Sequence, residues 1–190
     1  MKPLNQHYLA SLVDLLNAGR FADAEASARA LIKDYPQHFI LHHLLGIAQD
    51  GQNKPEAAIS SYHSALKLNA NMPEIHFNLG IAYARTGKLQ QAMECYRNTI
   101  KRQPKFFEAY TNLGSLLQTQ GLLEEAVVLY RQALHIEEDA RGHFNLGTAL
   151  RDQGKLDEAL QHFERAIALS PNDANIHNYR GEVLRDQGKM

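Results

Sequence analysis

The chain has 190 residues, and its 20 lysines and arginines nearly balance its 21 aspartates and glutamates. With a net charge of −1, the chain has no acidic or basic excess that points to nucleic acid or anionic lipid as a partner. The single cysteine, Cys95, rules out an internal disulfide, and the apolar runs are too short to span a membrane. We expect a cytoplasmic protein that binds neither nucleic acid nor membrane, with a processed periplasmic protein as the alternative.

Glycine, alanine and aromatic residues recur along the chain at a regular interval of about 34 residues. A fixed period of this length is typical of a repeat architecture. All the series share a single one-residue deletion, which lies between Ala133 and His143. The series are Gly46, Gly80, Gly114 and Gly147; Gly19, Asn53, Gly87, Gly121, Gly154 and Gly188; Ala24, Ala58, Ala92, Ala126 and Ala159; and Tyr62, Tyr96, Tyr130 and Phe163.

Each period reads as two antiparallel helices joined by a tight turn, which predicts an all-α fold without strands. The first glycine of a unit lets its two helices approach closely, and the second glycine takes the left-handed backbone that ends the first helix. The first unit departs most from this pattern, because Leu12 replaces the first glycine and Ala28 replaces the aromatic residue. In chain order, the predicted units span residues 5–38, 39–72, 73–106, 107–139 and 140–173, and a single helix follows at 174–187.

These units resemble the tetratricopeptide repeat, whose pattern is Trp-x2-Leu-Gly-x2-Tyr, then Ala-x3-Phe, then Pro. The fifth unit reads His143-x2-Leu146-Gly147-x2-Leu150, then Ala159-x3-Phe163, then Pro171. The resemblance implies an α–α superhelix, a tetratricopeptide solenoid of about five and a half repeats over residues 1–190. It also implies a concave groove that binds a protein or an extended peptide.

The residues that could carry chemistry do not assemble into a predicted active site. Neighbouring helices lie about 8–10 Å apart, too far for their histidines to share a zinc ion with ligands at about 2.0–2.1 Å. We interpret the recurring histidines as packing residues that replace an aromatic ring, and Cys95 as a packing residue without a partner base. We expect no catalytic residue, metal or cofactor in this chain. The recurring histidines are His42, His76, His143 and His177.

An asparagine occupies one equivalent position on the predicted inner wall of three consecutive units, at Asn78, Asn112 and Asn145. Each amide can both donate and accept, so a row of amides can hydrogen-bond the main chain of an extended peptide. The Asn-Leu-Gly triplets are similar to the asparagine ladder in the tetratricopeptide region of O-linked N-acetylglucosamine transferases. The alternative is that each asparagine holds an adjacent helix. The other predicted peptide-binding residues are Phe77, Ile81, Arg85, Thr111, Ser115, Phe144, Thr148 and Arg151.

We predict a scaffold that binds a protein or peptide in the concave groove and has no enzymatic activity of its own. A second hypothesis is the N-terminal, substrate-recruiting region of a larger glycosyltransferase or sulfotransferase, favoured by the ladder and by the end of the chain at Met190. A third is a structural array that self-associates. An adaptor that clamps the carboxylate of chaperone tails is excluded, because its basic and asparagine positions hold other residues. Those residues are His43, Ile47, Phe77, Ile81, Thr111 and Ser115.

Overall fold

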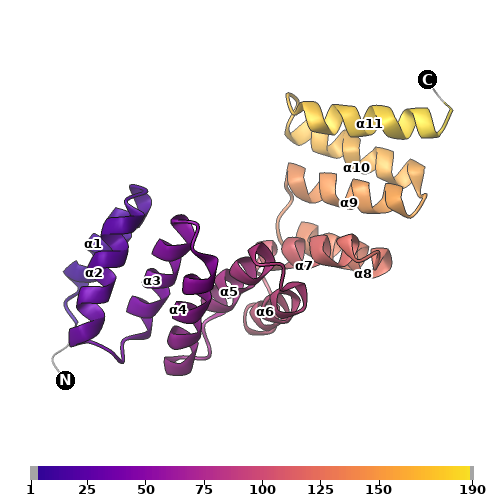
Figure 1. Cartoon of the computed structure of the whole chain (residues 1–190). Coiled ribbons are helices and arrows are strands. Elements are labelled where there is room, and N and C mark those ends of the chain that lie inside the picture. The colour runs from indigo at the N-terminus through magenta and orange to yellow at the C-terminus, as the bar shows by residue number, and fades with distance from the viewer. Residues whose placement is uncertain (1–3, 189–190) are drawn as a thin grey trace. The chain divides into compact units, whose positions relative to one another are not determined.

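A computed structural model describes residues 4–188, which form eleven helices and no strand (Figure 1). This confirms the predicted all-α fold. The ends of the predicted array, residues 1–3 and 189–190, lie outside the described residues. The helices are α1 (Gln6–Asn17), α2 (Phe21–Asp34), α3 (Phe39–Gly51), α4 (Pro55–Leu68), α5 (Pro73–Arg85), α6 (Leu89–Arg102), α7 (Phe107–Thr119), α8 (Leu123–Ile136), α9 (Ala140–Asp152), α10 (Leu156–Leu169) and α11 (Ala174–Asp186).

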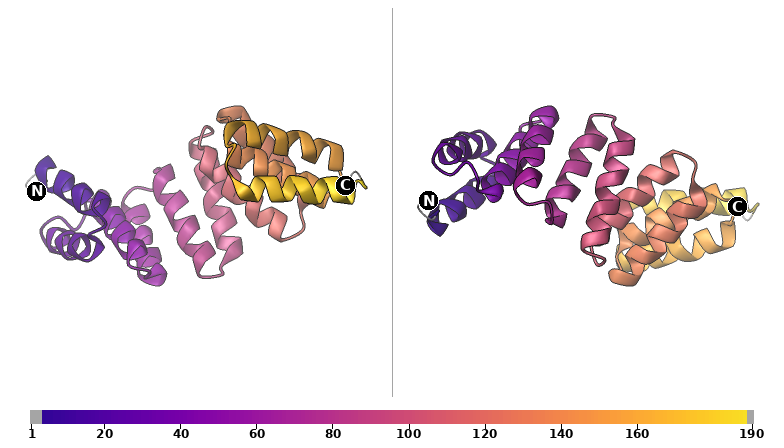
Figure 2. Two further views of the ribbon diagram at one scale, coloured as in Figure 1. Left: turned by 90° about the horizontal axis from the view of Figure 1, so that it is seen from above. Right: turned by 90° about the horizontal axis from the view of Figure 1, so that it is seen from below.

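The chain divides into two compact units, Met1–Gln103 with α1 to α6 and Pro104–Met190 with α7 to α11. Within each unit, consecutive helices pack as pairs, and the first helices of neighbouring pairs also contact one another (Figures 1 and 2). We call the face formed by α1, α3 and α5 wall 1, and the face formed by α7, α9 and α11 wall 2. The predicted superhelical path of the whole array stays a prediction.

Glycines bring the two helices of a pair close together, as the sequence predicts. The ring of Tyr130 lies over Gly114, where an added Cβ atom would come within 2.8 Å of it. The ring of Phe163 lies over Gly147 in the same way, at 2.9 Å. Both rings are at most 1% exposed. The periodic glycine and the periodic aromatic residue therefore form one contact at the core of the four pairs from α3–α4 to α9–α10.

The turn between the two helices of a pair needs a left-handed residue. Gly87 takes a φ of +74°, and Asn53, which replaces glycine in its series, takes +60°. Asn53 is the one residue other than glycine with a positive φ in the described part of the chain. Asparagine tolerates this conformation better than most residues. The backbone geometry thus explains why asparagine can stand at position 53, where the other units have glycine.

The recurring histidines have a role that the packing interpretation misses. The Nε2 atoms of His42, His76 and His177 lie 2.9, 3.0 and 2.8 Å from the backbone carbonyl oxygen six residues earlier. Tyr110 holds the equivalent position in α7, and its hydroxyl donates to the backbone carbonyl of Pro104, also six residues earlier, at 3.2 Å. The acceptor carbonyls lie in the turns between helix pairs, outside any helix, so these bonds give them a partner. They also tie each turn to the first helix of the next pair.

His143 differs because the one-residue deletion shortens the turn before α9 to residues 137–139, against residues 170–173 in the turn before α11. Its Nδ1 atom lies 3.0 Å from Nδ1 of His162, and its Nε2 atom lies 3.4 Å from Glu138. Asp139 caps the helix, since its Oδ1 accepts from the backbone N–H of Gly142 at 2.6 Å. The deletion therefore lies in a turn, where a pair can absorb it.

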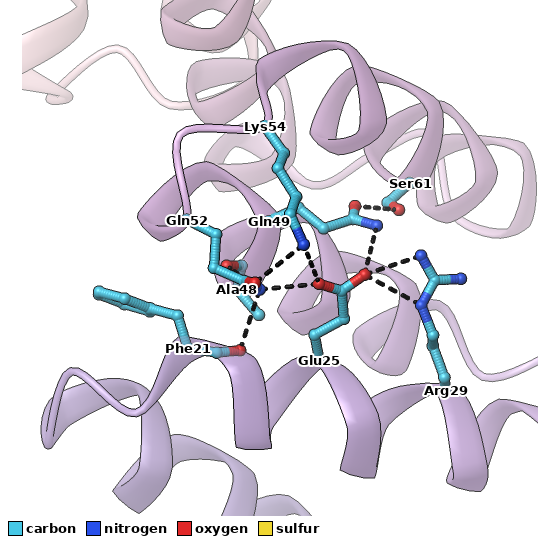
Figure 3. Close-up of polar contacts among 8 residues, drawn as sticks. All are labelled: Phe21, Glu25, Arg29, Ala48, Gln49, Gln52, Lys54 and Ser61. Carbon is cyan, nitrogen blue, oxygen red and sulfur yellow. Dashed lines mark hydrogen bonds and ion pairs between the residues drawn. The ribbon is translucent and has the colours of Figure 1, made fainter.

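A polar cluster joins α2 to the next pair of helices (Figure 3). The carboxylate of Glu25 lies 2.8 Å from Arg29 and 3.1 Å from Lys54, and it accepts from Nε2 of Gln52 at 2.7 Å. The Glu25 side chain is only 13% exposed. Hydrogen bonds from Arg29 above all, then from Lys54 and Gln52, lower its pKa to about 2. The ionised carboxylate is thus strongly preferred in the folded chain.

We expect Glu25→Gln to lower the free energy of unfolding by about 1–2 kcal/mol at pH 7, a modest value because Arg29 and Lys54 are more than half exposed. The folded pKa lies below the ordinary 4.5, so the contribution is present above that pH and is lost as the pH falls toward 2. Urea unfolding at pH 7 and pH 3 measures the effect. Glu94→Gln, an exposed position on α6, is the matched control. Equal losses for the variant at both pH values would contradict this account.

Candidate functional site

On wall 1, the polar residues predicted to face a ligand are already bonded to neighbouring elements of their own unit. Nδ2 of Asn78 lies 2.9 Å from Nε2 of His43 on α3. Burial lowers the pKa of His43 to about 4, so at neutral pH its uncharged ring can accept the amide proton. Arg85 forms an ion pair with Asp50 at 3.1 Å and donates to Oδ1 of Asn53 at 2.6 Å. Asn78 therefore takes the alternative role, in which the amide holds an adjacent helix.

The apolar residues of α5 on this wall are partly buried. Phe77 and Ile81 are both of intermediate exposure, and the ring of Phe77 lies 5.8 Å from that of Tyr96 on α6. The polar side chains of α5 on wall 1 are thus bonded to α3 and to the turn after it. Its apolar side chains contribute to packing within the unit.

Wall 2 keeps the predicted amides available. Asn112 on α7 and Asn145 on α9 are half-buried, and neither side-chain amide has a hydrogen-bond partner among the described residues. Ser115, one turn beyond Asn112, is exposed. The Thr148 hydroxyl donates to the backbone carbonyl of Asn145 at 2.8 Å, so it fixes the helix beside that amide. The two asparagines occupy equivalent positions on neighbouring helices that contact each other.

Thr111 does not fit the predicted contact set. It is 3% exposed, and its hydroxyl donates to the backbone carbonyl of Glu108 at 3.0 Å. A buried hydroxyl that bonds its own helix cannot reach a ligand without local unfolding. We therefore remove Thr111 from the proposed binding residues.

Arg151 links α9 to α11 rather than pointing freely into the groove. Its guanidinium lies 2.6 Å from Glu182 and 3.4 Å from Asp186, and 5.8 Å from the centre of the Tyr179 ring. Tyr179 also meets the Phe144 ring edge to face, with 5.0 Å between the ring centres. Phe144, a predicted residue, is therefore part of an aromatic pair that spans the two helices.

A hollow of about 600 Å³ opens on wall 2 beside this aromatic pair, where α9 and α11 begin. This hollow is not predictable from the sequence alone, because it exists only once the starts of α9 and α11 lie side by side. One signal was present, since Asp139 and Asp173 lie one repeat interval apart. The hollow is lined by Asp139, Ala140, Arg141, Phe144, Asp173, Asn175, Ile176 and Tyr179.

Metal binding, membrane spanning and nucleophilic catalysis each require a specific feature of the chain. Within residues 4–188, no group of three or more histidine, cysteine or acidic side chains could hold a metal ion. No helix in that range is both long and apolar enough to cross a membrane. Cys95 is buried, and burial raises the pKa of its thiol to about 12. A thiol that stays protonated at neutral pH is a poor nucleophile.

Comparisons with protein families agree with this architecture. A family model described as TPR repeat matches residues 51–87 and 147–188, and a model described as tetratricopeptide repeat matches residues 77–143. Together these segments make up more than half of the chain. The chain belongs to the tetratricopeptide repeat family.

Several solved structures share the fold. MamA is 22% identical, with a TM-score of 0.78 over 90% of this chain and 93% of that chain. A tetratricopeptide repeat protein from Parabacteroides merdae is 23% identical, with a TM-score of 0.82 over 97% of this chain and 73% of that chain. YrrB, described as a TPR protein with an unusual peptide-binding site, is 20% identical, with a TM-score of 0.75 over 86% of this chain and 84% of that chain. A search of curated proteins finds no match.

Proposed function

We propose that this chain is a binding scaffold that holds an extended segment of a partner protein against wall 2. The observation that carries the proposal is the pair of amides at Asn112 and Asn145, in register on adjacent helices and without partners among the described residues. Both amides are partly exposed, so a ligand can replace the water bound to them, and each hydrogen bond that it forms contributes about 0.5–1.5 kcal/mol. An extended main chain offers both the donors and the acceptors that these amides need.

Two further points support this assignment. The Asn-Leu-Gly triplets are similar to the ladder in the tetratricopeptide region of O-linked N-acetylglucosamine transferases. YrrB, which has the same fold, is described as having a peptide-binding site. The single cysteine, which needs no oxidising environment, is consistent with our proposal of a cytoplasmic protein without enzymatic activity.

The ladder also supports a second version of the proposal, in which wall 2 recruits substrate for a larger glycosyltransferase or sulfotransferase. The residues that bind the extended segment would be the same. Self-association is a different hypothesis, and Tyr8 and Val13 on α1 would serve it, because these apolar side chains are 46% and 41% exposed. A mass that rises with concentration in light scattering would favour self-association.

The test is an unbiased selection of peptides from a random display library on the immobilised chain. The selected peptides are then titrated into isotopically labelled chain, and the backbone amide shifts are followed by NMR. We expect the largest shifts on α7, α9 and α11, around Asn112 and Asn145. Shifts concentrated on α8 and α10, or failure to select any peptide, would contradict the proposal.

A further inference from the structure

We propose that the hollow at the start of α9 and α11 is a specificity pocket for a cationic side chain, arginine in preference to lysine, of the bound segment. This inference rests on the proposed function, since the segment must lie along wall 2. Tyr179 holds on α11 the position that Asn145 holds on α9, one repeat earlier in the chain. A segment that follows Asn112 and Asn145 across the wall next meets Tyr179 and the pocket beside it.

The walls of the pocket suit a guanidinium group. Phe144 and Tyr179 meet edge to face, and Ile176, which also lines the pocket, is 2% exposed. A planar guanidinium stacks on aromatic faces, and its cation is attracted by the ring electrons. Tyr179 already makes one such contact within the chain, because the guanidinium of Arg151 lies 5.8 Å from the centre of its ring.

The charges that line the pocket also favour a cation. Asp139 and Asp173 each use Oδ1 to cap a helix, accepting from the backbone N–H groups of Gly142 and Asn175. No partner for the second carboxylate oxygen of either residue is found among residues 4–188.

The remaining charged residue in the lining is Arg141, which is exposed and has no ion-pair partner within the described chain. Two carboxylates and one guanidinium give the lining side chains a formal charge of −1, which the N-terminal dipoles of α9 and α11 offset in part, since a helix dipole acts only near its first turn and is screened by salt. A guanidinium presents several donors in one plane and can bond two carboxylates at once, whereas the ammonium of lysine is a compact point charge.

The decisive variant is Asp139→Asn combined with Asp173→Asn. Asparagine caps a helix about as well as aspartate, so the variant removes charge and keeps the fold. The probes are an arginine-containing peptide from the library selection and the same peptide with citrulline, which has the shape of arginine without its charge. Fluorescence anisotropy measures both affinities, and thermal unfolding checks that the variant is folded.

We expect the unsubstituted chain to select peptides enriched in arginine and to bind the citrulline peptide roughly three- to tenfold more weakly, because cation–π contacts and partly exposed ion pairs are each modest. The double variant should lose this preference and still bind the citrulline peptide as the parent does. Arg141→Gln should strengthen binding of the arginine peptide, because it removes a like charge from the pocket rim.

The outcomes separate this inference from the proposed function. Peptides that bind wall 2 without arginine enrichment, or with a preference that survives the double variant, would overturn the pocket and leave the scaffold intact. Failure of every peptide to bind would overturn both.

Discussion

Gly114→Val and Gly147→Val should each lower the free energy of unfolding by about 1–3 kcal/mol, the usual cost of overpacking a core. A Cβ atom at Gly114 would come within 2.8 Å of the Tyr130 ring, and one at Gly147 within 2.9 Å of the Phe163 ring. Neither ring can move away freely, because the exposed fraction of each residue is at most 1%. The paired helices must therefore separate, and each variant should show a lower midpoint in urea unfolding followed by circular dichroism.

Gly181 provides a matched control in the same chain. It lies one repeat interval after Gly147, at the same position of its helix, but a Cβ atom there would meet nothing within 4 Å. Gly181→Val should be neutral or slightly stabilising, because valine is a better helix former than glycine. If Gly181→Val destabilises the chain as much as Gly114→Val does, the ring contact is not the cause.

These contacts show how far the sequence could predict the fold. Gly114 and Tyr130 recur together because one makes room for the other, so a shared period was enough to pair them. Asn53 was predictable for a similar reason, since few residues other than glycine adopt a positive φ at a helix end. Features that repeat with the backbone can be read from a single sequence.

The hydrogen-bond partners of the asparagine side chains were less predictable, because they depend on which residue the neighbouring helix places beside each amide. Asn78 meets His43, whose neutral ring accepts its amide proton. Thr111 is the residue of α7 that corresponds to His43, but its hydroxyl bonds Glu108 in its own helix. Asn145 therefore stays unpaired although it holds the same position in its unit. Periodicity predicts the position of an amide and leaves its partner undetermined.

The pocket at the starts of α9 and α11 was still harder to predict from the sequence. Its carboxylates look like ordinary helix caps in the sequence, and Tyr179 looks like the residue that ends the ladder. Only their common location on adjacent helix starts gives them a shared role. Sites of this kind arise from side chains in separate repeats that differ from the consensus, so a search for recurring residues passes over them.

Asn112→Ala combined with Asn145→Ala should weaken binding of a selected peptide roughly ten- to a hundredfold. Each lost hydrogen bond costs about 0.5–1.5 kcal/mol, and about 1.4 kcal/mol is a factor of ten in affinity. The free energy of unfolding should change by no more than about 0.5 kcal/mol, because neither amide bonds another part of the described chain. Fluorescence anisotropy and urea unfolding on the same protein preparation measure the two effects.

Asn78→Ala should give the opposite result, because this amide bonds His43 and not a ligand. We expect unchanged peptide affinity and a loss of about 1 kcal/mol in the free energy of unfolding, since the variant leaves a half-buried ring nitrogen without its donor. If Asn78→Ala weakens binding while the double variant binds normally, the ligand lies on wall 1. If the double variant unfolds at a lower urea concentration instead, Asn112 and Asn145 hold helices together in solution, and wall 2 has no free ladder to offer.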